Sequence, residues 1–300
     1  MTTTLTFLIG VDGGGTGTRV TIADANGSEL ARGSAGPSGL INGTDSAWAA
    51  ILTAIREAFG LAKLDMPAFA SMAIGLGLAG VHNRQWAQQF AEKNPGFAFL
   101  QLETDAYTTV LGAHQGRPGA IVAIGTGSVG EAIRADGSHC EVGGWGFPCG
   151  DEAGGAWIGM RAVNHVQQVL DGRMPPSEFS AAVLEHCGGN VAALFAWLAS
   201  ATQGSYAQIA PLVVKHAGQE NNAVAEQIMI AAGQEIVKIA LALDQTSELP
   251  LALCGGLAKP LEHYLPASLR SRLIAPQGDS VTGALLLIKK IIQGNHVKST

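Results

Sequence analysis

Residues 5–18 read LTFLIGVDGGGTGT, an apolar stretch that ends in Asp12, three glycines and Thr16. The apolar part, Leu5–Val11, is typical of a buried strand. The glycines after it predict a tight loop in which the backbone can come close to an anion. Two further strands joined by a hairpin turn are predicted after the loop: Thr18–Ala23, the turn Asp24–Gly27, and Glu29–Ser34.

The same pattern starts again 110 residues later in the chain. Gly15-Thr16-Gly17-Thr18 matches Gly125-Thr126-Gly127-Ser128, and Ala25-Asn26-Gly27-Ser28 matches Ala135-Asp136-Gly137-Ser138. Two matches at one offset, each at the same point of a strand, loop and hairpin, indicate an internal duplication. We therefore expect each half of the chain to carry its own hairpin, with glycine-rich turns that face each other.

Strands and helices alternate along the rest of the chain, which predicts an α/β fold of two similar domains. A length of 300 residues suffices for both. The predicted domains are residues 1–116 and 117–300, joined near residues 114–118, and it is left open whether the final helix packs back on the first domain. The remaining predicted elements are Ser46–Phe59 (closed by Gly60), Met72–Leu78, Arg84–Glu92, Phe97–Leu102, Ala106–Gly112, Ile121–Ile124, Val129–Arg134, Cys140–Val142, Ala156–Leu170, Pro176–Leu198, Asn222–Leu243, Leu251–Leu253 and Val281–Gln293.

Composition argues against several classes of protein. The net charge of −6 and the pI near 5.7 argue against a nucleic-acid polymer as partner, because such proteins are normally basic. The four cysteines form no CxxC pair, and we expect free thiols in a reducing cytoplasm. The N-terminal segment lacks a basic region before its apolar residues, and no apolar run approaches membrane-spanning length, so neither export nor a membrane partner is expected.

Glycine-rich turns follow predicted strands at four places: Asp12–Thr16, Gly125–Ser128, Gly143–Gly146 and Gly255-Gly256. Backbone amides and hydroxyls in such turns can bind phosphate. One turn alone is more typical of an ordinary β-turn, but two turns at equal spacing predict a pair of loops that hold a triphosphate. Asp12 would hold Mg²⁺ beside the phosphates, or else it only caps the turn.

Two further places carry carboxylates that suit a sugar substrate. Residues 143–152 combine glycines, Trp145, Asp151 and Glu152, which offers an apolar surface for a ring face and acceptors for hydroxyls. Asp105 follows the strand Phe97–Leu102, and α/β folds bind ligands at the carboxyl ends of their strands. We interpret Asp105 as a general base, with helix capping as the alternative.

These motifs together resemble the BadF/BadG/BcrA/BcrD ATPase family, and within it the N-acetylglucosamine kinases and bacterial glucosamine kinases. The resemblance runs from Leu5 to the final helix. It implies two RNase H-like, actin-like ATPase domains that flank a nucleotide and sugar cleft, with ATP and Mg²⁺ as cofactors. The motifs that carry it are Asp12–Thr16, Thr104–Ala106, Gly125–Ser128, Gly144–Gly146, Gly150–Glu152 and Cys254–Gly256.

The resemblance also implies roles for single residues. It makes Asp105 the catalytic base, in contact with the substrate. Asp151 is the rival for that role, because it too lies in the predicted sugar region. It places the phosphates on Gly13, Gly14, Gly15 and Thr16 and on Gly125, Thr126, Gly127 and Ser128, and the adenosine side on Gly255 and Gly256. It places the sugar on Gly144, Trp145, Gly146 and Asp151.

One position departs from the family's pattern. Relatives often carry a sugar-binding Asn after the first hairpin, where this chain has Ser38 or Gly39. Asn42 takes that role only if the loop is shifted, so the sequence leaves the contact to the amino group open.

The resemblance implies phosphorylation of N-acetylglucosamine at the 6-hydroxyl, with glucosamine as the alternative substrate, by a homodimer. Two less favoured alternatives stay open. One is an ATPase that activates a dehydratase through an iron–sulfur cluster, for which Cys140 and Cys149 have poor spacing. The other is a sugar sensor without catalysis, which would normally carry a DNA-binding segment.

Overall fold

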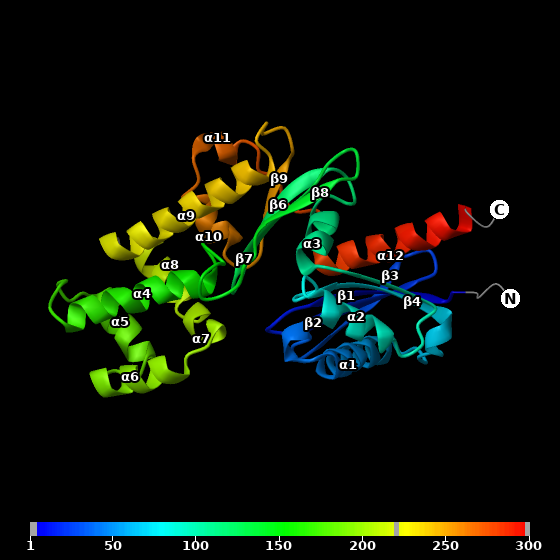
Figure 1. The fold of residues 1–300 in the computed structure, drawn as a ribbon, viewed down its shortest axis with the longest axis horizontal. Helices are drawn as coiled ribbons and strands as arrows, with labels where there is room; N and C mark the ends of the chain where they lie inside the picture. Colours follow the sequence, from blue (N-terminus) through cyan, green and yellow to red (C-terminus); the bar gives the residue numbers. More distant parts are fainter. Residues whose placement is uncertain (1–4, 219–221, 298–300) are drawn as a thin grey trace. The chain divides into compact units, whose positions relative to one another are not determined.

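The computed structural model describes residues 5–218 and 222–297 and divides into two units (Figure 1). The first unit joins Met1–Gly119 with Ala275–Thr300, and the second is Ala120–Ile274. The division therefore differs from the predicted ranges of 1–116 and 117–300. The chain returns to the first unit at its end, because the final helix packs on the first sheet.

The first unit contains a five-stranded sheet of order β3-β2-β1-β4-β5. β2 pairs antiparallel with β1 and β3, whereas β4 pairs parallel with β1 and β5. The apolar run of residues 5–11 thus lies in a central strand, as the sequence predicts. The strands are β1 (Phe7–Gly13), β2 (Thr18–Asp24), β3 (Glu29–Ala35), β4 (Met72–Leu78) and β5 (Phe99–Glu103).

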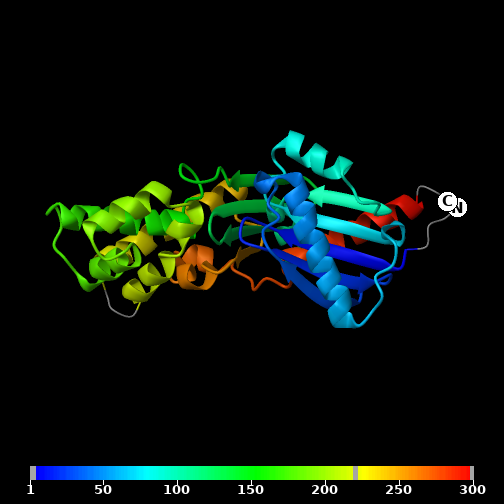
Figure 2. The same ribbon diagram turned by 90° about the horizontal axis from the view of Figure 1, so that it is seen from below.

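Helices cover both faces of this sheet, with α1 and α12 on opposite sides (Figures 1 and 2). The face toward α1 buries Val11, Ile22, Ile51 and Phe59 in one apolar cluster. The unit's helices are η1 (Leu40–Asn42), α1 (Thr44–Ala62), η2 (Phe69–Ser71), α2 (Arg84–Glu92), α3 (Asp105–Ala113) and α12 (Ser280–Val297).

Glycines bring α12 into direct backbone contact with the sheet and with α3. A β-carbon on Gly75 would lie 2.1 Å from the Ala284 carbonyl oxygen, and one on Gly283 would lie 1.8 Å from the Thr108 carbonyl oxygen. Real β-carbons essentially never come that close to other atoms. The return of the chain therefore depends on the absence of side chains at these points.

The second unit repeats the strand order of the first without its last strand, in a sheet of order β8-β7-β6-β9. Where the fifth strand would lie, one parallel bridge links Leu251 and Leu273. The strands are β6 (Gly119–Ile124), β7 (Ser128–Ile133), β8 (His139–Gly143) and β9 (Leu251–Cys254). The duplication predicted from the 110-residue offset is therefore present in the topology.

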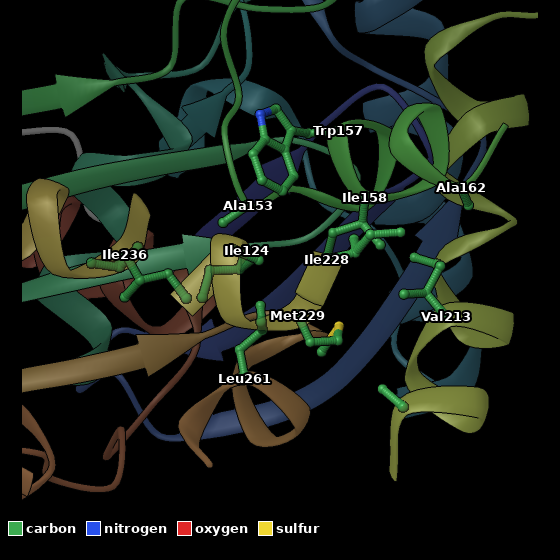
Figure 3. Packing of buried hydrophobic residues seen from close by; sticks show 14 of the residues in the cluster. Ile124, Ala153, Trp157, Ile158, Ala162, Val213, Ile228, Met229, Ile236 and Leu261 are labelled. Carbon is green, nitrogen blue, oxygen red and sulfur yellow. The ribbon is translucent and has the colours of Figure 1, made fainter. Parts of the chain in front are cut away.

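The core of the second unit lies between its helices and one face of its sheet. Ile124 of the sheet belongs to one apolar cluster with Trp157 and Ile158 of α4 and Ile236 of α9 (Figure 3). The unit's helices are α4 (Gly155–Leu170), α5 (Glu178–His186), α6 (Val191–Ser200), α7 (Gln203–Ala207), α8 (Ala210–Gly218), α9 (Ala223–Leu243), α10 (Ala258–Glu262) and α11 (Ala267–Arg270).

The predicted end of the first long helix at Gly60 is wrong. α1 does not stop at Gly60 but continues to Ala62, and Lys63 takes the left-handed conformation with φ 56°. A glycine inside a helix costs only about 1 kcal/mol, which burial of the neighbouring Phe59 can offset. Within the described ranges, no single helix passes the length and hydropathy test for a membrane span, and α5 with α6, bent by 57°, pass it only as a pair.

Two glycine substitutions test the contact of α12 with the sheet. Gly75→Ala should lower stability by about 1–3 kcal/mol, because the new methyl group overpacks a backbone contact. Gly60→Ala is the matched control: its β-carbon would meet nothing within 4 Å, and it should raise stability by about 1 kcal/mol. Thermal unfolding of both variants measures the difference, and equal melting temperatures would contradict the close contact.

Candidate functional site

The carboxyl ends of three parallel strands meet at one edge of the first sheet. Asp12 on β1 is in register with Gly77 on β4, and Gly77 is in register with Glu103 on β5. Asp105 follows β5 by two residues, and the first glycine loop follows β1. The predicted carboxylates and the first loop are thus brought to the same edge, where α/β folds bind ligands.

The first glycine loop is fixed on one side. The Gly14 amide donates to the Gly17 carbonyl at 3.0 Å, and the Gly14 carbonyl accepts from the amides of Ser38 and Gly39 at 3.2 and 3.0 Å. A β-carbon on Gly13 would lie 2.0 Å from the Ser38 hydroxyl oxygen. Position 13 therefore requires glycine for close packing below the loop.

The other side of the same loop is open. β-carbons on Gly14 and Gly15 would meet nothing within 4 Å, and Thr16 is exposed. The tip therefore offers backbone and a hydroxyl to an incoming anion.

The second glycine loop is fixed by the start of α4. The amides of Gly155 and Ala156 donate to the carbonyls of Gly125 and Thr126 at 2.8 and 2.9 Å. The Gly125 amide donates to the Gly127 carbonyl at 2.9 Å, which closes the turn. The loop is therefore held by backbone contacts on one side, as the first loop is.

The two loops use equivalent hydroxyls in the same way. Thr18 and Ser128 are both buried, and their hydroxyls donate to the carbonyls of Gly36 and Glu152. Ser128, predicted to bind phosphate, thus supports its loop with its hydroxyl. The loop tips instead carry Thr16, which is exposed, and its equivalent Thr126, which is half-buried.

Asp105 is the first residue of α3, and it is not the cap of that helix. Thr104 is the N-cap, and its hydroxyl accepts the amide of Tyr107 at 3.0 Å. The capping alternative for the Asp105 carboxylate therefore does not hold. The carboxylate accepts the amide of Ala106 at 3.0 Å, within the same turn at the sheet edge.

Asp12, the predicted magnesium ligand, is paired with a cation. Arg19 Nε donates to Asp12 Oδ2 at 2.9 Å, across the first pair of strands. Among the residues that the structure describes, no cluster of three or more His, Cys, Asp or Glu side chains could hold a metal ion. The site still fits Mg²⁺ that arrives on ATP, because Mg²⁺ is commonly held by one or two carboxylates, waters and the substrate's phosphates.

The predicted sugar loop follows β8 and is rich in left-handed backbone. Gly143, Gly144 and Gly146 have φ values of 78°, 69° and 87°, which favour glycine. Trp145 between them is 88% exposed. A β-carbon on Gly150 would lie 2.7 Å from the β-carbon of Trp145, so the loop folds back on itself at that point.

Asp151 lies beneath this loop and is buried. Its Oδ1 accepts the Gly146 amide at 3.1 Å, and its Oδ2 accepts the side-chain amide of Gln203 at 2.8 Å. Burial raises the pKa of Asp151 above its ordinary value, while these two hydrogen bonds lower it. Sequence reasoning missed Gln203, because no short motif links α7 to a loop more than fifty residues earlier.

Gly255 and Gly256 follow β9 at the edge that also carries the second glycine loop. Ala123 of β6 is in register with Cys254 of β9, so both strands end together. Gly255 has φ 91°, and a β-carbon there would lie 2.3 Å from the Ile124 carbonyl oxygen. Glycine is therefore required where this turn crosses the end of β6.

Asn42 is exposed at the end of η1, beside a hollow of about 500 Å³. Leu40, Ile41 and Trp86 give the hollow apolar walls, and Asp45 also lines it. The Leu40 amide donates to the carbonyl of Ala79, just beyond β4, at 2.9 Å. The hollow therefore begins at the same sheet edge as the first glycine loop.

Comparison with known proteins gives relatives that cover nearly all of the chain. Glucosamine kinase GspK of Vibrio cholerae serotype O1 is 30% identical over 286 residues, 95% of this chain and 97% of the relative. An N-acetyl-D-glucosamine kinase of Dictyostelium discoideum is 27% identical over 274 residues, 83% of this chain and 85% of the relative. A solved structure from Chromobacterium violaceum, provisionally named an N-acetylglucosamine kinase, is 51% identical with a TM-score of 0.92 over 95% of this chain and 99% of its own.

The likeness to that structure, together with the strand order repeated in both sheets, confirms the predicted actin-like ATPase fold. The model of the BadF/BadG/BcrA/BcrD ATPase family matches residues 9–287. The chain therefore belongs to the BadF/BadG/BcrA/BcrD ATPase family.

Proposed function

We propose that this ATP-dependent sugar kinase transfers the γ-phosphoryl group of ATP to the 6-hydroxyl of N-acetylglucosamine. The observation that carries the proposal is the repeated glycine loop. Each sheet ends in a loop that is fixed on one side and carries a threonine at its tip, Thr16 in one unit and Thr126 in the other. Relatives named for glucosamine and N-acetylglucosamine phosphorylation support an amino sugar as acceptor.

We assign the phosphates of ATP to the two loops and its adenosine side to the turn at Gly255 and Gly256. The open sides of Gly14 and Gly15 allow an anion to approach the backbone without a clash. Asp12 would hold Mg²⁺, which neutralises phosphate charge when it is bound. Its pairing with Arg19 keeps the carboxylate at the end of β1.

We assign the role of general base to Asp105. Phosphoryl transfer needs a hydroxyl that is oriented in line with the phosphate and gives up its proton. Asp105 suits this role because it lies at the carboxyl edge of the first sheet and Thr104 provides the helix cap. We assign Asp151 to the binding of sugar hydroxyls instead, because it lies beneath the Gly144–Gly146 loop and its Oδ1 accepts the Gly146 amide.

The hollow beside Asn42 favours the acetylated sugar. Its carboxylate, Asp45, lies 2.6 Å from the Lys93 ammonium, which offsets its negative charge. An acetamido group is uncharged and can use the apolar wall formed by Leu40 and Trp86. Glucosamine would bring an amino group that takes up a proton and gains little from Asp45, because this carboxylate is 85% exposed and already paired with Lys93.

Two observations argue against the alternative functions, a dehydratase activator and a sugar sensor without catalysis. Cys140 lies on β8, with its Sγ 3.8 Å from the Leu243 carbonyl oxygen, and Cys149 lies in the predicted sugar loop. This placement gives no support to an iron–sulfur site shared by these cysteines. The repeated loops argue for phosphate chemistry, which a sensor without catalysis does not need.

The substrate choice is tested by steady-state kinetics with both sugars. We expect kcat/KM for N-acetylglucosamine to exceed that for glucosamine by roughly 10-fold or more, the usual value of one group in a matched pocket. Lys93→Ala leaves Asp45 without its cation, so it should improve kcat/KM for glucosamine and reduce the ratio of the two kcat/KM values. Lys238→Ala on α9 is the control and should leave this ratio unchanged. A higher kcat/KM for glucosamine would reverse the choice of sugar, and no ADP release with either sugar would contradict the proposed function.

Replacing Asp105 tests the base. Asp105→Asn should lower kcat by about 10² to 10⁴, the range for general-base assistance, with ATP binding nearly unchanged. The melting temperature should move little, because Thr104 and not Asp105 caps α3. Asp171→Asn at an exposed surface site is the matched control and should keep full turnover. Near-normal turnover of Asp105→Asn, combined with loss of turnover in Asp151→Asn, would reverse the two assignments.

A further inference from the structure

Asp151 is held by groups from three separate segments of the second unit. It accepts hydrogen bonds from the Gly146 amide in the sugar loop and from Gln203 on α7. On its third side, a β-carbon on Gly127 of the phosphate loop would lie 2.2 Å from Asp151 Oδ2. The residue itself has φ 60°, an uncommon value for a residue other than glycine. Such backbone persists only where the surroundings hold it in place.

Gln203 is fixed at the first position of α7. Thr202 and Ser205 form a reciprocal capping box around it, in which each side chain bonds the other residue's amide. The Gln203 side-chain nitrogen then reaches Asp151 Oδ2 at 2.8 Å, across 52 residues of sequence. The start of this short helix is therefore tied to Asp151.

α7 is itself docked on both the sugar loop and α4. The Tyr206 ring lies 5.5 Å from the ring of Phe147, which belongs to the loop, and 4.9 Å from the ring of Trp197. A β-carbon on Gly159 of α4 would lie 1.9 Å from the Tyr206 carbonyl oxygen. Because α7 is placed by these contacts independently of Gln203, it can serve as a rigid support for the Gln203 side chain.

We propose that Gln203 is a positioning residue that keeps Asp151 ionised and in place, and thereby keeps the Gly143–Asp151 loop in the conformation that binds the sugar. This role rests on the proposed function of the loop. A neutral amide suits it well, since it donates to the carboxylate without cancelling its charge. Protonation of Asp151 would turn one carboxyl oxygen into a donor and remove the charge that strengthens the hydrogen bond from the Gly146 amide to the other oxygen.

The surroundings of Asp151 determine how readily its carboxylate takes up a proton. Burial raises its pKa, Glu152 beside it raises the pKa further, and hydrogen bonds from Gly146, Gln203 and the Ser128 backbone oppose both. The titratable side chain on α7 is Tyr206. Burial raises the pKa of Tyr206, so this side chain stays neutral. The other titratable side chain of the sugar loop is Cys149, and the phosphate loop has none. Removal of the Gln203 amide must therefore raise the pKa of Asp151.

The kinetic test compares Gln203→Leu with Gln208→Leu, a matched control at the exposed end of the same helix. As the pH is lowered, the KM for sugar should begin to rise at a pH about one unit higher in Gln203→Leu than in the wild type. A pKa shift of this size corresponds to the loss of one charge-assisted hydrogen bond. At alkaline pH the two KM values should converge, and the KM for ATP should stay within about twofold. Gln203→Glu should shift the acid limb at least as far, because it adds a like charge.

A second measurement does not depend on activity. Hydrogen exchange of the peptide that covers residues 143–150 would be measured over a series of pH values, with both variants compared at the same pH. As the pH falls, this peptide should lose its protection at a higher pH in Gln203→Leu than in Gln208→Leu. This measurement remains informative even if the wild type phosphorylates no amino sugar. Such a result would contradict the proposed function but not the contact between Gln203 and Asp151. Equal exchange in both variants, or a rise in KM of the same size at every pH, would overturn the role of Gln203.

Discussion

Close backbone contact at positions without side chains is the constraint on which both units of this protein depend. In the first unit, Gly75 and Gly283 let the final helix lie directly on the sheet and on α3. In the second, Gly127 gives room to Asp151, and Gly159 gives room to α7. A methyl group at these points would overlap carbonyl or carboxylate oxygens. The unusual glycine content of the chain, 40 of 300 residues, is partly explained by such contacts and not by loops alone.

These contacts fix the elements whose ends carry the chemistry. Once α12 holds β1 and β4, the first glycine loop and Asp105 are held at one edge of the sheet. In the second unit, backbone amides at the start of α4 donate hydrogen bonds to the carbonyls of Gly125 and Thr126 and hold the second loop in a similar way. Each loop is thus held by backbone hydrogen bonds on its inner side, and the tip of the first loop is open. Rigid donors that need little rearrangement are what stabilise developing phosphate charge most effectively.

Much of this could be predicted from local sequence. The 110-residue offset between the glycine loops predicts the repeated strand order, because hairpin turns and glycine loops have strong local signatures. Three features could not be predicted. The return of α12 to the first unit, the contact of Gln203 with Asp151 and the inward turn of the Ser128 hydroxyl all depend on tertiary contacts between distant segments. The end of α1 beyond Gly60 shows that packing can also override a local stop signal.

The most direct test of the central claim is to identify the product. The purified protein would be incubated with ATP and N-acetylglucosamine carrying ¹³C at carbon 6, and the product would be followed by carbon and phosphorus NMR. The account predicts that the carbon 6 signal gains a coupling to phosphorus as ATP is converted to ADP. Release of inorganic phosphate with an unchanged carbon 6 signal, or phosphate on another carbon, would contradict it.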